Sequence, residues 1–108
     1  MVRRWLPALA IFLLTGPAPL LAWAASHRIA QKDRAFDVGD VTIAAGDDLL
    51  FTNEDPFLHQ IYVTSPAMNF ESSEQPPGQT VDVRFANAGI FTVRCHIHPK
   101  MSLTVTVK

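Results

Sequence analysis

Residues 89–108 read GIFTVRCHIHPKMSLTVTVK, which is two alternating runs with a short irregular segment between them. Apolar residues or cysteine occupy every second position of each run: Phe91, Val93 and Cys95 in the first, and Leu103, Val105 and Val107 in the second. Alternation of this kind is typical of strands that bury one face. Pro99 excludes a helix between the runs. The stretch therefore predicts two strands joined by a short loop, with Cys95 facing inward where the loop begins.

The same period of two recurs upstream, and no stretch after residue 24 has a convincing helical pattern. The further alternating runs are residues 41–43, 49–52, 59–64 and 81–85, and the turn signals between them are residues 45–48, 53–56, 76–78 and 87–89. Short strands punctuated in this way are typical of an antiparallel sandwich. We therefore expect an all-β fold, an antiparallel Greek-key β-sandwich, in which His59 faces inward like Cys95. Residues 65–79 are expected to form a surface loop.

The first 24 residues are typical of a cleaved export signal. Arg3 and Arg4 form a basic start, residues 6–21 are mostly apolar, and residues 22–24, Ala-Trp-Ala, offer small side chains at the two positions that a signal peptidase recognises. A membrane anchor is the alternative, but it needs about 20 continuous apolar residues, and glycine and prolines interrupt this run. We expect residues 1–24 to be removed on export to the periplasm, which leaves residues 25–108 as a single domain without stable membrane insertion.

The charge balance excludes nucleic acid as a partner. The chain has 9 basic and 10 acidic residues, a net charge of −1, and the first 24 residues hold Arg3 and Arg4 but no acidic residue. The mature domain is therefore mildly acidic, at about −3, and has no basic patch of the kind that binds nucleic acid. A domain of this size often relies on a metal or a disulfide for stability.

Cys95 is the only cysteine of the chain, so an intramolecular disulfide is excluded. An unpaired thiol in an exported protein needs an explanation. Taken alone, Cys95 could be a metal ligand, an inert buried thiol or one half of an intermolecular bridge.

The segment after Cys95 combines the donors that copper prefers. Cys95, His98 and Met101 follow one another at three-residue steps, and His59 is the candidate for a second imidazole. Thiolate and thioether are soft donors, and one Cys, two His and a weak axial Met define the trigonal site of electron-transfer copper proteins. Each of these residues alone is more often structural. Their combination round one short loop favours a site for one copper ion.

Two other residues are weaker candidates for metal contact. His96 follows an inward cysteine, so alternation turns it outward, and Met68 lies in the expected surface loop. Zinc is the alternative metal because it accepts Cys and His, but Met is a poor ligand for it.

Four motifs between residues 29 and 108 carry a family resemblance. They are a Gly-Asp turn at Gly46-Asp47 followed by an apolar strand and Asn53, a first ligand histidine at His59, the approach Ala88-Gly89-Ile90-Phe91, and the loop Cys-x-x-His-x-x-Met at residues 95–101. In these the chain resembles the cupredoxins, and among them the small amicyanin-like and plastocyanin-like proteins of the methylamine-utilisation type. The resemblance implies a cupredoxin-like fold with a type 1 blue copper site. It makes His59, Cys95 and His98 the equatorial ligands and Met101 the weak axial one.

Two positions depart from the family pattern. The first ligand histidine is usually followed by an Asn whose side chain ties the two ligand loops together, and Gln60 stands there instead. The loop usually has a small or polar residue and Pro between Cys and His, where this chain has His96-Ile97. Both departures bear on the rigidity and the reduction potential of the site.

The resemblance implies an electron carrier that cycles between Cu(II) and Cu(I), and not an enzyme. His59 is expected to be buried and His98 to be exposed at one edge, so that electrons pass through His98. The patch expected around it is mostly apolar with one positive charge, and its members are Pro56, Phe57, Leu58, Pro99 and Lys100. Such a patch suits transient docking of redox partner proteins, for example a dehydrogenase and a c-type cytochrome. The protein itself is expected to be a monomer.

Two other functions stay open on the sequence. An extracytoplasmic protein that binds and delivers copper would use His96 and Met68 as extra donors. An enzyme would need a Cys95 nucleophile or an open copper position. For a Cys95 nucleophile, the sequence offers no separate orienting acid and no oxyanion signature. A ligand set completed by Met leaves no open position on the copper.

Overall fold

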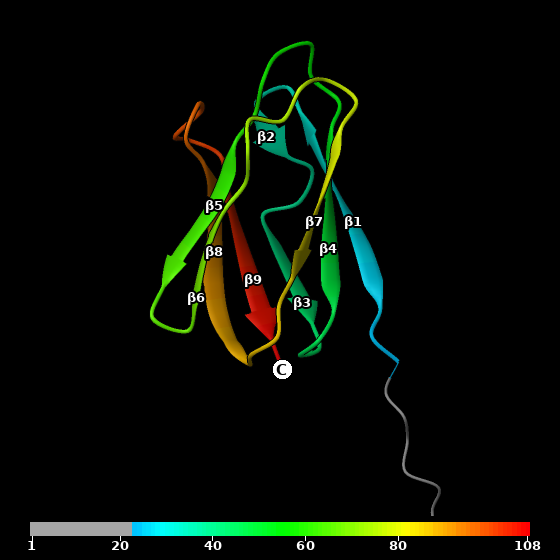
Figure 1. Cartoon of the computed structure of the whole chain (residues 1–108), viewed down its shortest axis with the longest axis vertical. Coiled ribbons are helices and arrows are strands. Elements are labelled where there is room, and N and C mark those ends of the chain that lie inside the picture. Colours follow the sequence, from blue (N-terminus) through cyan, green and yellow to red (C-terminus); the bar gives the residue numbers. More distant parts are fainter. Residues whose placement is uncertain (1–22) are drawn as a thin grey trace, which may run out of the picture.

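The computed structural model describes residues 23–108, so the predicted signal peptide of residues 1–24 lies almost wholly outside the described part (Figure 1). No helix in the described part is long and apolar enough to cross a membrane. The strands of this part are β1 (Ser26–Lys32), β2 (Ala35–Phe36), β3 (Asp40–Ile43), β4 (Asp48–Asn53), β5 (Ile61–Ser65), β6 (Met68–Glu71), β7 (Thr80–Arg84), β8 (Gly89–Cys95) and β9 (Ser102–Val107).

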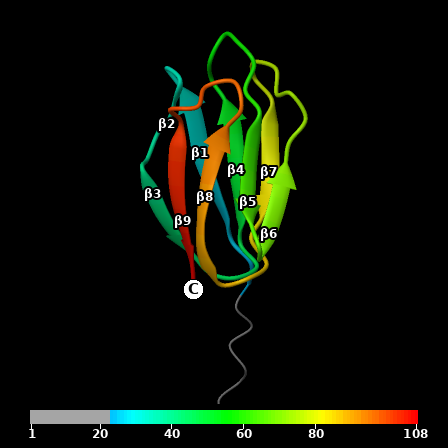
Figure 2. The ribbon, with the colours of Figure 1, turned by 90° about the vertical axis from the view of Figure 1, so that its left-hand side faces the viewer.

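The strands form two sheets that pack face to face (Figure 2). One sheet has the order β2-β1-β4-β7 and the other the order β3-β9-β8-β5-β6. The predicted all-β sandwich is confirmed. Its sheets are mixed, because β1 pairs with β4 and β3 pairs with β9 in parallel, while the other pairings are antiparallel. The parallel pairs arise where the chain crosses between the sheets, since β3 leaves the sheet of β1 and β2 and joins the edge of the other beside β9.

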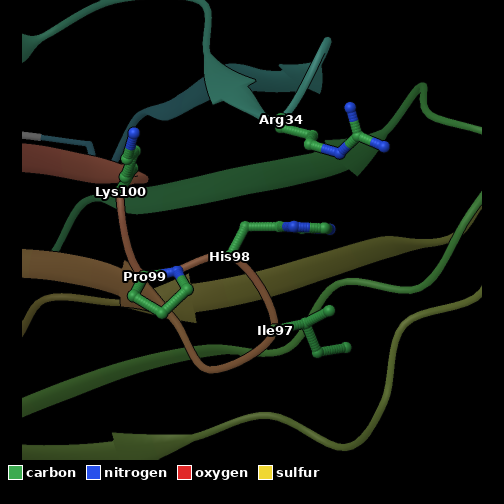
Figure 3. Close-up of a pocket in the computed structure, with 5 residues that line it drawn as sticks. All are labelled: Arg34, Ile97, His98, Pro99 and Lys100. Carbon is green, nitrogen blue, oxygen red and sulfur yellow. The ribbon is translucent and has the colours of Figure 1, made fainter.

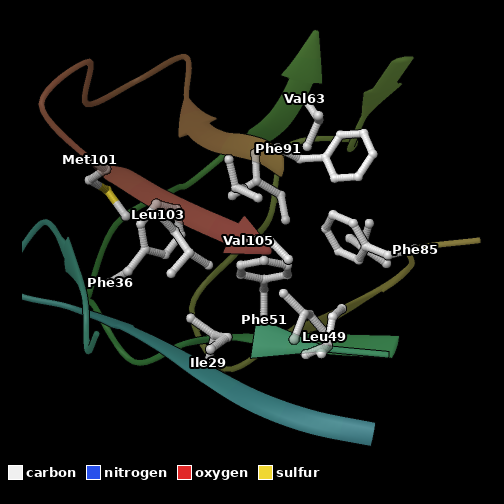
Figure 4. Close-up of a cluster of buried hydrophobic side chains, with 14 of the residues drawn as sticks. Ile29, Phe36, Leu49, Phe51, Val63, Phe85, Phe91, Met101, Leu103 and Val105 are labelled. Atoms are coloured by element: carbon white, nitrogen blue, oxygen red, sulfur yellow. The ribbon is translucent and has the colours of Figure 1, made fainter. Parts of the chain in front are cut away.

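The interior of the sandwich is filled by the inward positions that alternation predicted (Figure 4). Phe51, Phe85, Ile61 and Leu103 are completely buried, and Phe85 packs against Phe91 with ring centroids 5.9 Å apart. Each such side chain contributes about 1.5 to 3 kcal/mol to folding by leaving water. This core fixes the two sheets against each other and thereby fixes the loops at their ends.

The prediction that residues 65–79 form a loop is wrong for part of the segment, because β6 lies within it. Strand β6 pairs antiparallel with β5, with Ser65 opposite Met68 and Tyr62 opposite Glu71. Met68 and Phe70 are half-buried and alternate with exposed residues, so they pack partly against the core. This alternation is short and follows a turn directly, which is why the segment resembles a loop in the sequence.

Two loops meet at the end of the sandwich away from the C-terminus (Figure 1). One joins β4 to β5 and contains His59, and the other joins β8 to β9 and contains residues 96–101. Because β5 and β8 are neighbours in one sheet, with Ile61 opposite Cys95, their adjoining loop residues are brought together.

Candidate metal centre

His59 and Cys95 lie in contact at this end of the sandwich. His59 forms a bridge with Gln75 just before β5 begins, and Cys95 is the last residue of β8. The relative exposure of His59 is 0% and that of Cys95 is 1%. The Nδ1 atom of His59 lies 3.6 Å from the Sγ atom of Cys95. The predicted inward orientation of both residues is therefore confirmed, and a thiol and an imidazole meet in a dry environment.

The backbone of Gln60 ties the two ligand loops together. Its N–H group donates to the Sγ atom of Cys95 at 3.4 Å, and its carbonyl accepts from the N–H of His96 at 2.9 Å. Its side chain turns elsewhere, donating to the carbonyl of Ser72 at 2.9 Å. Two main-chain hydrogen bonds of Gln60 thus tie the two loops together, and the sulfur of Cys95 accepts one of them.

A carboxylate orients the ring of His59 from the side opposite Cys95. The Nε2 atom of His59 lies 2.8 Å from Oδ2 of Asp55, and both side chains are almost completely buried. An ionised carboxylate only accepts hydrogen bonds, so Nε2–H of His59 is the donor. In a neutral imidazole this leaves the lone pair on Nδ1. That lone pair faces Cys95, as a metal ligand requires.

Asp55 is itself held by the turn between β1 and β2. The backbone N–H groups of Asp33 and Arg34 donate to its two carboxylate oxygens at 2.7 and 3.1 Å. Both turn residues have positive φ, 55° and 56°, although neither is glycine, and such a conformation costs about 1 to 3 kcal/mol per residue. Burial raises the pKa of the Asp55 carboxyl, but the hydrogen bonds from His59, Arg34 and Asp33 outweigh it and lower that pKa below its usual value.

A buried amide network continues from the site into the sandwich. The side chain of Asn53 donates to the carbonyls of Phe57 and Gln75, at 2.8 and 2.9 Å, and its Oδ1 accepts from the N–H of Asp55. The side-chain oxygen of Gln75 accepts from Gln31 at 2.8 Å. Polar groups inside a protein are costly unless they are paired. This pairing fixes the loop that carries His59.

His98 lies beside His59 and is half-buried. Its ring packs against those of Phe57 and His59, with centroids 5.1 and 5.2 Å away, so the side chain is half-buried. Its Nε2 atom is buried and has no hydrogen-bond partner among residues 23–108. Burial, together with the nearby charges of His59 and Arg34, lowers the pKa of His98. The turn around Phe57 covers one side of the ring, and the ring also lines a surface hollow with Arg34 and Lys100.

Met101 lies in the core at the loop end of β9 (Figure 4). It is 2% exposed, and its N–H donates to the carbonyl of His98 at 3.0 Å, which closes the loop. Of the four predicted ligands, the structure brings Cys95 and His59 into contact, packs His98 against His59, and buries Met101 in the same core cluster as Cys95. Within residues 23–108 no three His, Cys, Asp or Glu side chains stand together as a metal-binding group.

The two weaker candidates lie away from this centre. His96 points outward as predicted, stacked on Tyr62 with ring centroids 3.8 Å apart and 3.5 Å from a carboxylate oxygen of Glu71. Met68 begins β6 at the other end of the sandwich, where it lines a hollow with Phe85 and Asn87.

Sequence reasoning missed Asp55 and Arg34. Asp55 stands four residues before His59, inside a segment interpreted only as a turn, and a carboxylate so close to a ligand histidine was the available signal. Arg34 lies far from the loop in the sequence, yet its guanidinium sits 4.9 Å above the ring of Phe57. Only the fold reveals that it belongs to this end of the molecule.

The donors at this end fit a copper ion by their chemistry. A thiol that accepts a backbone hydrogen bond, an imidazole with its lone pair facing that thiol and a buried thioether are a soft set, which selects copper over harder metals. The unpartnered Nε2 atom of His98 is a further indication, because a buried polar nitrogen without a partner is costly.

Comparison with solved structures shows which fold this is. The Cu-containing nitrite reductase from Thermus scotoductus SA-01 matches with a TM-score of 0.69 and 22% sequence identity, over 75% of this chain and 22% of that chain. The chain thus spans less than a quarter of that protein's length. The reduced form of an amicyanin variant matches with a TM-score of 0.72 and 16% identity, over 77% of this chain and 82% of that chain, and a Cu(I) form of another variant matches equally at 15% identity. No protein-family model and no curated protein matches the sequence. At these identities the comparisons show the fold, which is cupredoxin-like as the resemblance implied.

Proposed function

We propose that this protein is an electron carrier that binds one copper ion through His59, Cys95, His98 and Met101. The observation that carries the proposal is the contact of 3.6 Å between Sγ of Cys95 and Nδ1 of His59, both buried at the end of a cupredoxin-like sandwich. A copper ion supplies reversible one-electron exchange between Cu(II) and Cu(I). The similar structures include a copper-containing nitrite reductase and a Cu(I) form of amicyanin, and this supports the choice of metal.

The surrounding residues suit this role because they restrict movement. Asp55 holds the ring of His59, and the backbone of Gln60 holds the sulfur of Cys95. A site that changes little between oxidation states needs little reorganisation, and a rigid sandwich limits such change. His98 is the candidate ligand that reaches a surface hollow, so electrons are proposed to pass through it. Met101 caps the interior side, which favours a carrier over an enzyme with an open metal position.

Export to the periplasm and transient docking of redox proteins belong to the same proposal. Export rests on the pattern of residues 1–24, and docking rests on the position of His98 beside the surface. The methylamine-utilisation type and the monomeric state stay predictions.

Reconstitution with Cu(II) tests the proposal. The protein is expected to show an intense visible band and a narrow copper hyperfine splitting in EPR. Cys95→Ser should abolish the band, because only the thiolate supplies sulfur-to-copper charge transfer, although the imidazoles still bind copper weakly. His96→Gln is the matched control, since His96 points outward next to Cys95, and it should keep the band. A colourless reconstituted protein, or a full band in Cys95→Ser, would refute the ligand assignment.

Copper delivery is the second candidate function, and the positions of its two expected extra donors give it little support. His96 is stacked on Tyr62 and Met68 lies at the opposite end of the sandwich. A carrier should retain copper against a modest chelator and return to the same visible band after a reduction and oxidation cycle. Rapid loss of copper to the chelator would favour delivery.

A further inference from the structure

A hollow of about 280 Å³ lies directly over His98 (Figure 3). Its lining comes from two segments far apart in the sequence, namely the turn between β1 and β2 and the loop after β8. The lining residues are Arg34, Ile97, His98, Pro99 and Lys100. The sequence alone placed one positive charge here, and the fold adds a second by bringing Arg34 to the same surface.

The hollow is positively charged although the molecule is not. Arg34 and Lys100 line it, and no carboxylate does. In the part of the chain that the structure describes, neither cation has a carboxylate oxygen within 4.0 Å. Asp33 neighbours Arg34 in the turn but does not line the hollow. Residues 25–108 carry a net charge of about −3, so the local charge at this surface is opposite to the overall charge.

The position of Arg34 is fixed by the fold. Its backbone N–H donates to Asp55 at 3.1 Å, and its guanidinium lies 4.9 Å from the centre of the Phe57 ring. A cation over an aromatic face is attracted by the negative potential of the ring face. The turn therefore presents Arg34 beside the candidate ligand loop.

Apolar side chains complete this surface. Ile97 is 40% exposed and Leu58 is 38% exposed, and Pro99 lines the hollow with Ile97. Weak redox complexes bury a small area, and charges at the rim of such an area guide the approach of a partner and select its sign.

We propose that this surface, made of Arg34, Leu58, Ile97, His98, Pro99 and Lys100, docks redox partner proteins whose own electron-transfer face is acidic. The proposal rests on the proposed function, because it makes His98 the point of electron exchange. Carboxylates of the partner pair with Arg34 and Lys100, and its apolar centre packs against Ile97 and Pro99. A partner with a basic face is repelled at the same surface.

Electron exchange with a matched pair of proteins tests the charge preference. The probes are a mitochondrial cytochrome c, which is basic, and the same cytochrome after succinylation of its lysines, which is acidic. The rate of oxidation of the copper-loaded, reduced protein is measured by stopped flow. At low ionic strength the double variant Arg34→Gln, Lys100→Gln should react about tenfold more slowly with the acidic cytochrome and no more slowly with the basic one. The difference should vanish at about 1 M salt, where charges are screened beyond about 3 Å.

The matched control removes two cations elsewhere. Arg84→Gln with Lys108→Gln makes the same change in net charge at exposed positions near the C-terminal end of the sandwich. Its rate with the acidic cytochrome should fall by less than about twofold, because those charges lie at the opposite end of the sandwich from the hollow and are further from a partner docked over His98. An equal loss of rate in both double variants would overturn the proposal, because net charge alone would then explain it. A slower reaction of Arg34→Gln, Lys100→Gln with the basic cytochrome would overturn it as well.

A measurement without copper separates this proposal from the proposed function. If the protein fails to bind copper or shows no electron exchange, the proposed function fails, whereas docking is still measured by NMR of the metal-free protein. Adding the acidic cytochrome should shift the amide signals of Ile97, His98, Lys100, Asp33 and Arg34, and the double variant should lose these shifts. Shifts produced by succinate alone at the same sites, with none from the cytochrome, would identify a small-anion site and overturn docking.

Discussion

At the end of the sandwich that holds His59 and Cys95, buried polar side chains form one hydrogen-bonded network, whereas the interior toward the C-terminus is filled by aromatic and aliphatic side chains. The polar end joins Asp55, Asn53 and Gln75 through side-chain contacts of 2.9 Å or less. The apolar end relies on Phe85 and Phe91. The difference indicates that hydrophobic burial holds the sheets together, while directed hydrogen bonds determine how the candidate ligands are oriented.

The largest effect on stability is expected at the apolar end. Phe85 is completely buried, so Phe85→Ala leaves a cavity and should lower the free energy of unfolding by about 3 to 5 kcal/mol. The visible band of the copper-loaded protein should not move as long as the protein is folded. Urea unfolding followed by circular dichroism measures the first quantity, and absorption measures the second.

If Phe85→Ala does not fold, Phe85→Leu is the less disruptive substitution at the same position. A smaller loss of stability with an unchanged band is expected for it. A displaced band in either variant would contradict the separation of the two ends.

At the polar end, Asp55→Asn should alter the site more than the fold. Asn keeps an acceptor for the turn but offers an amide N–H where His59 needs an acceptor, so the protonated nitrogen of the ring is no longer fixed. Loss of such an outer contact typically costs 10–100-fold in metal affinity, and loss of a charged hydrogen bond should lower the free energy of unfolding by about 1 to 3 kcal/mol. Copper titration and urea unfolding measure these two changes.

Nitrogen-15 NMR of the His59 ring tests directly whether Asp55 fixes the ring proton on Nε2. In the unmodified, metal-free protein the proton is expected on Nε2, and in Asp55→Asn it should be shared between Nε2 and Nδ1. Asp40→Asn is the control, because it removes one exposed carboxylate at the start of β3. An unchanged ring signal and an unchanged affinity in Asp55→Asn would show that Asp55 has no part in orienting His59.

Met101→Leu should have a smaller effect on stability, since the two side chains have similar volume and such exchanges usually cost less than about 1.5 kcal/mol. The copper-loaded variant is expected to keep its visible band. Its reduction potential should rise, because removal of a weak donor disfavours Cu(II) more than Cu(I). Cyclic voltammetry measures the change, and a fall in potential with the fold intact would argue against Met101 as the axial ligand.

The inward residues of this fold could be predicted because strand alternation is a local property. His59, Cys95 and the core phenylalanines follow from it directly, and the structure confirms that they are buried. The parallel pairing of β1 with β4 could not be predicted, because it depends on how the chain crosses between sheets.

Sequence reasoning also missed the outer parts of the site, because their contacts depend on tertiary structure. Asp55 acts on His59 only because a turn some twenty residues earlier in the chain returns to hold its carboxylate. Arg34 approaches His98 for the same reason. Strand alternation predicted which residues face inward, but it did not predict the contacts that Asp55 and Arg34 make in the folded chain.

The turn at Gly46-Asp47 lies at the end of the sandwich away from His59. The pH dependence of its stability therefore tests whether the two ends of the sandwich act independently. Gly46 has φ of +94°, which glycine adopts without strain. The carboxylate of Asp47 accepts hydrogen bonds from the N–H groups of Ala25 and Ala44 at 2.8 and 3.0 Å, and the ring of His27 lies 3.1 Å away. The hydrogen bonds from Ala25, Ala44 and His27 lower the pKa of Asp47 from 3.8 to about 2.

The last and smallest effect is expected from Asp47→Asn, and it is confined to the acid range. Because the folded-state pKa is depressed, the unfolded chain binds the proton first, so the stabilisation is complete above pH 3.8 and is lost as the pH falls toward 2. Urea unfolding of the metal-free protein should therefore show a shallower loss of stability over that interval in Asp47→Asn than in the unmodified protein, with lower stability at neutral pH. Asp40→Asn should follow the unmodified curve. Parallel curves for Asp47→Asn and the unmodified protein would contradict the role of Asp47, and an altered copper site at neutral pH would show that the two ends of the sandwich are coupled.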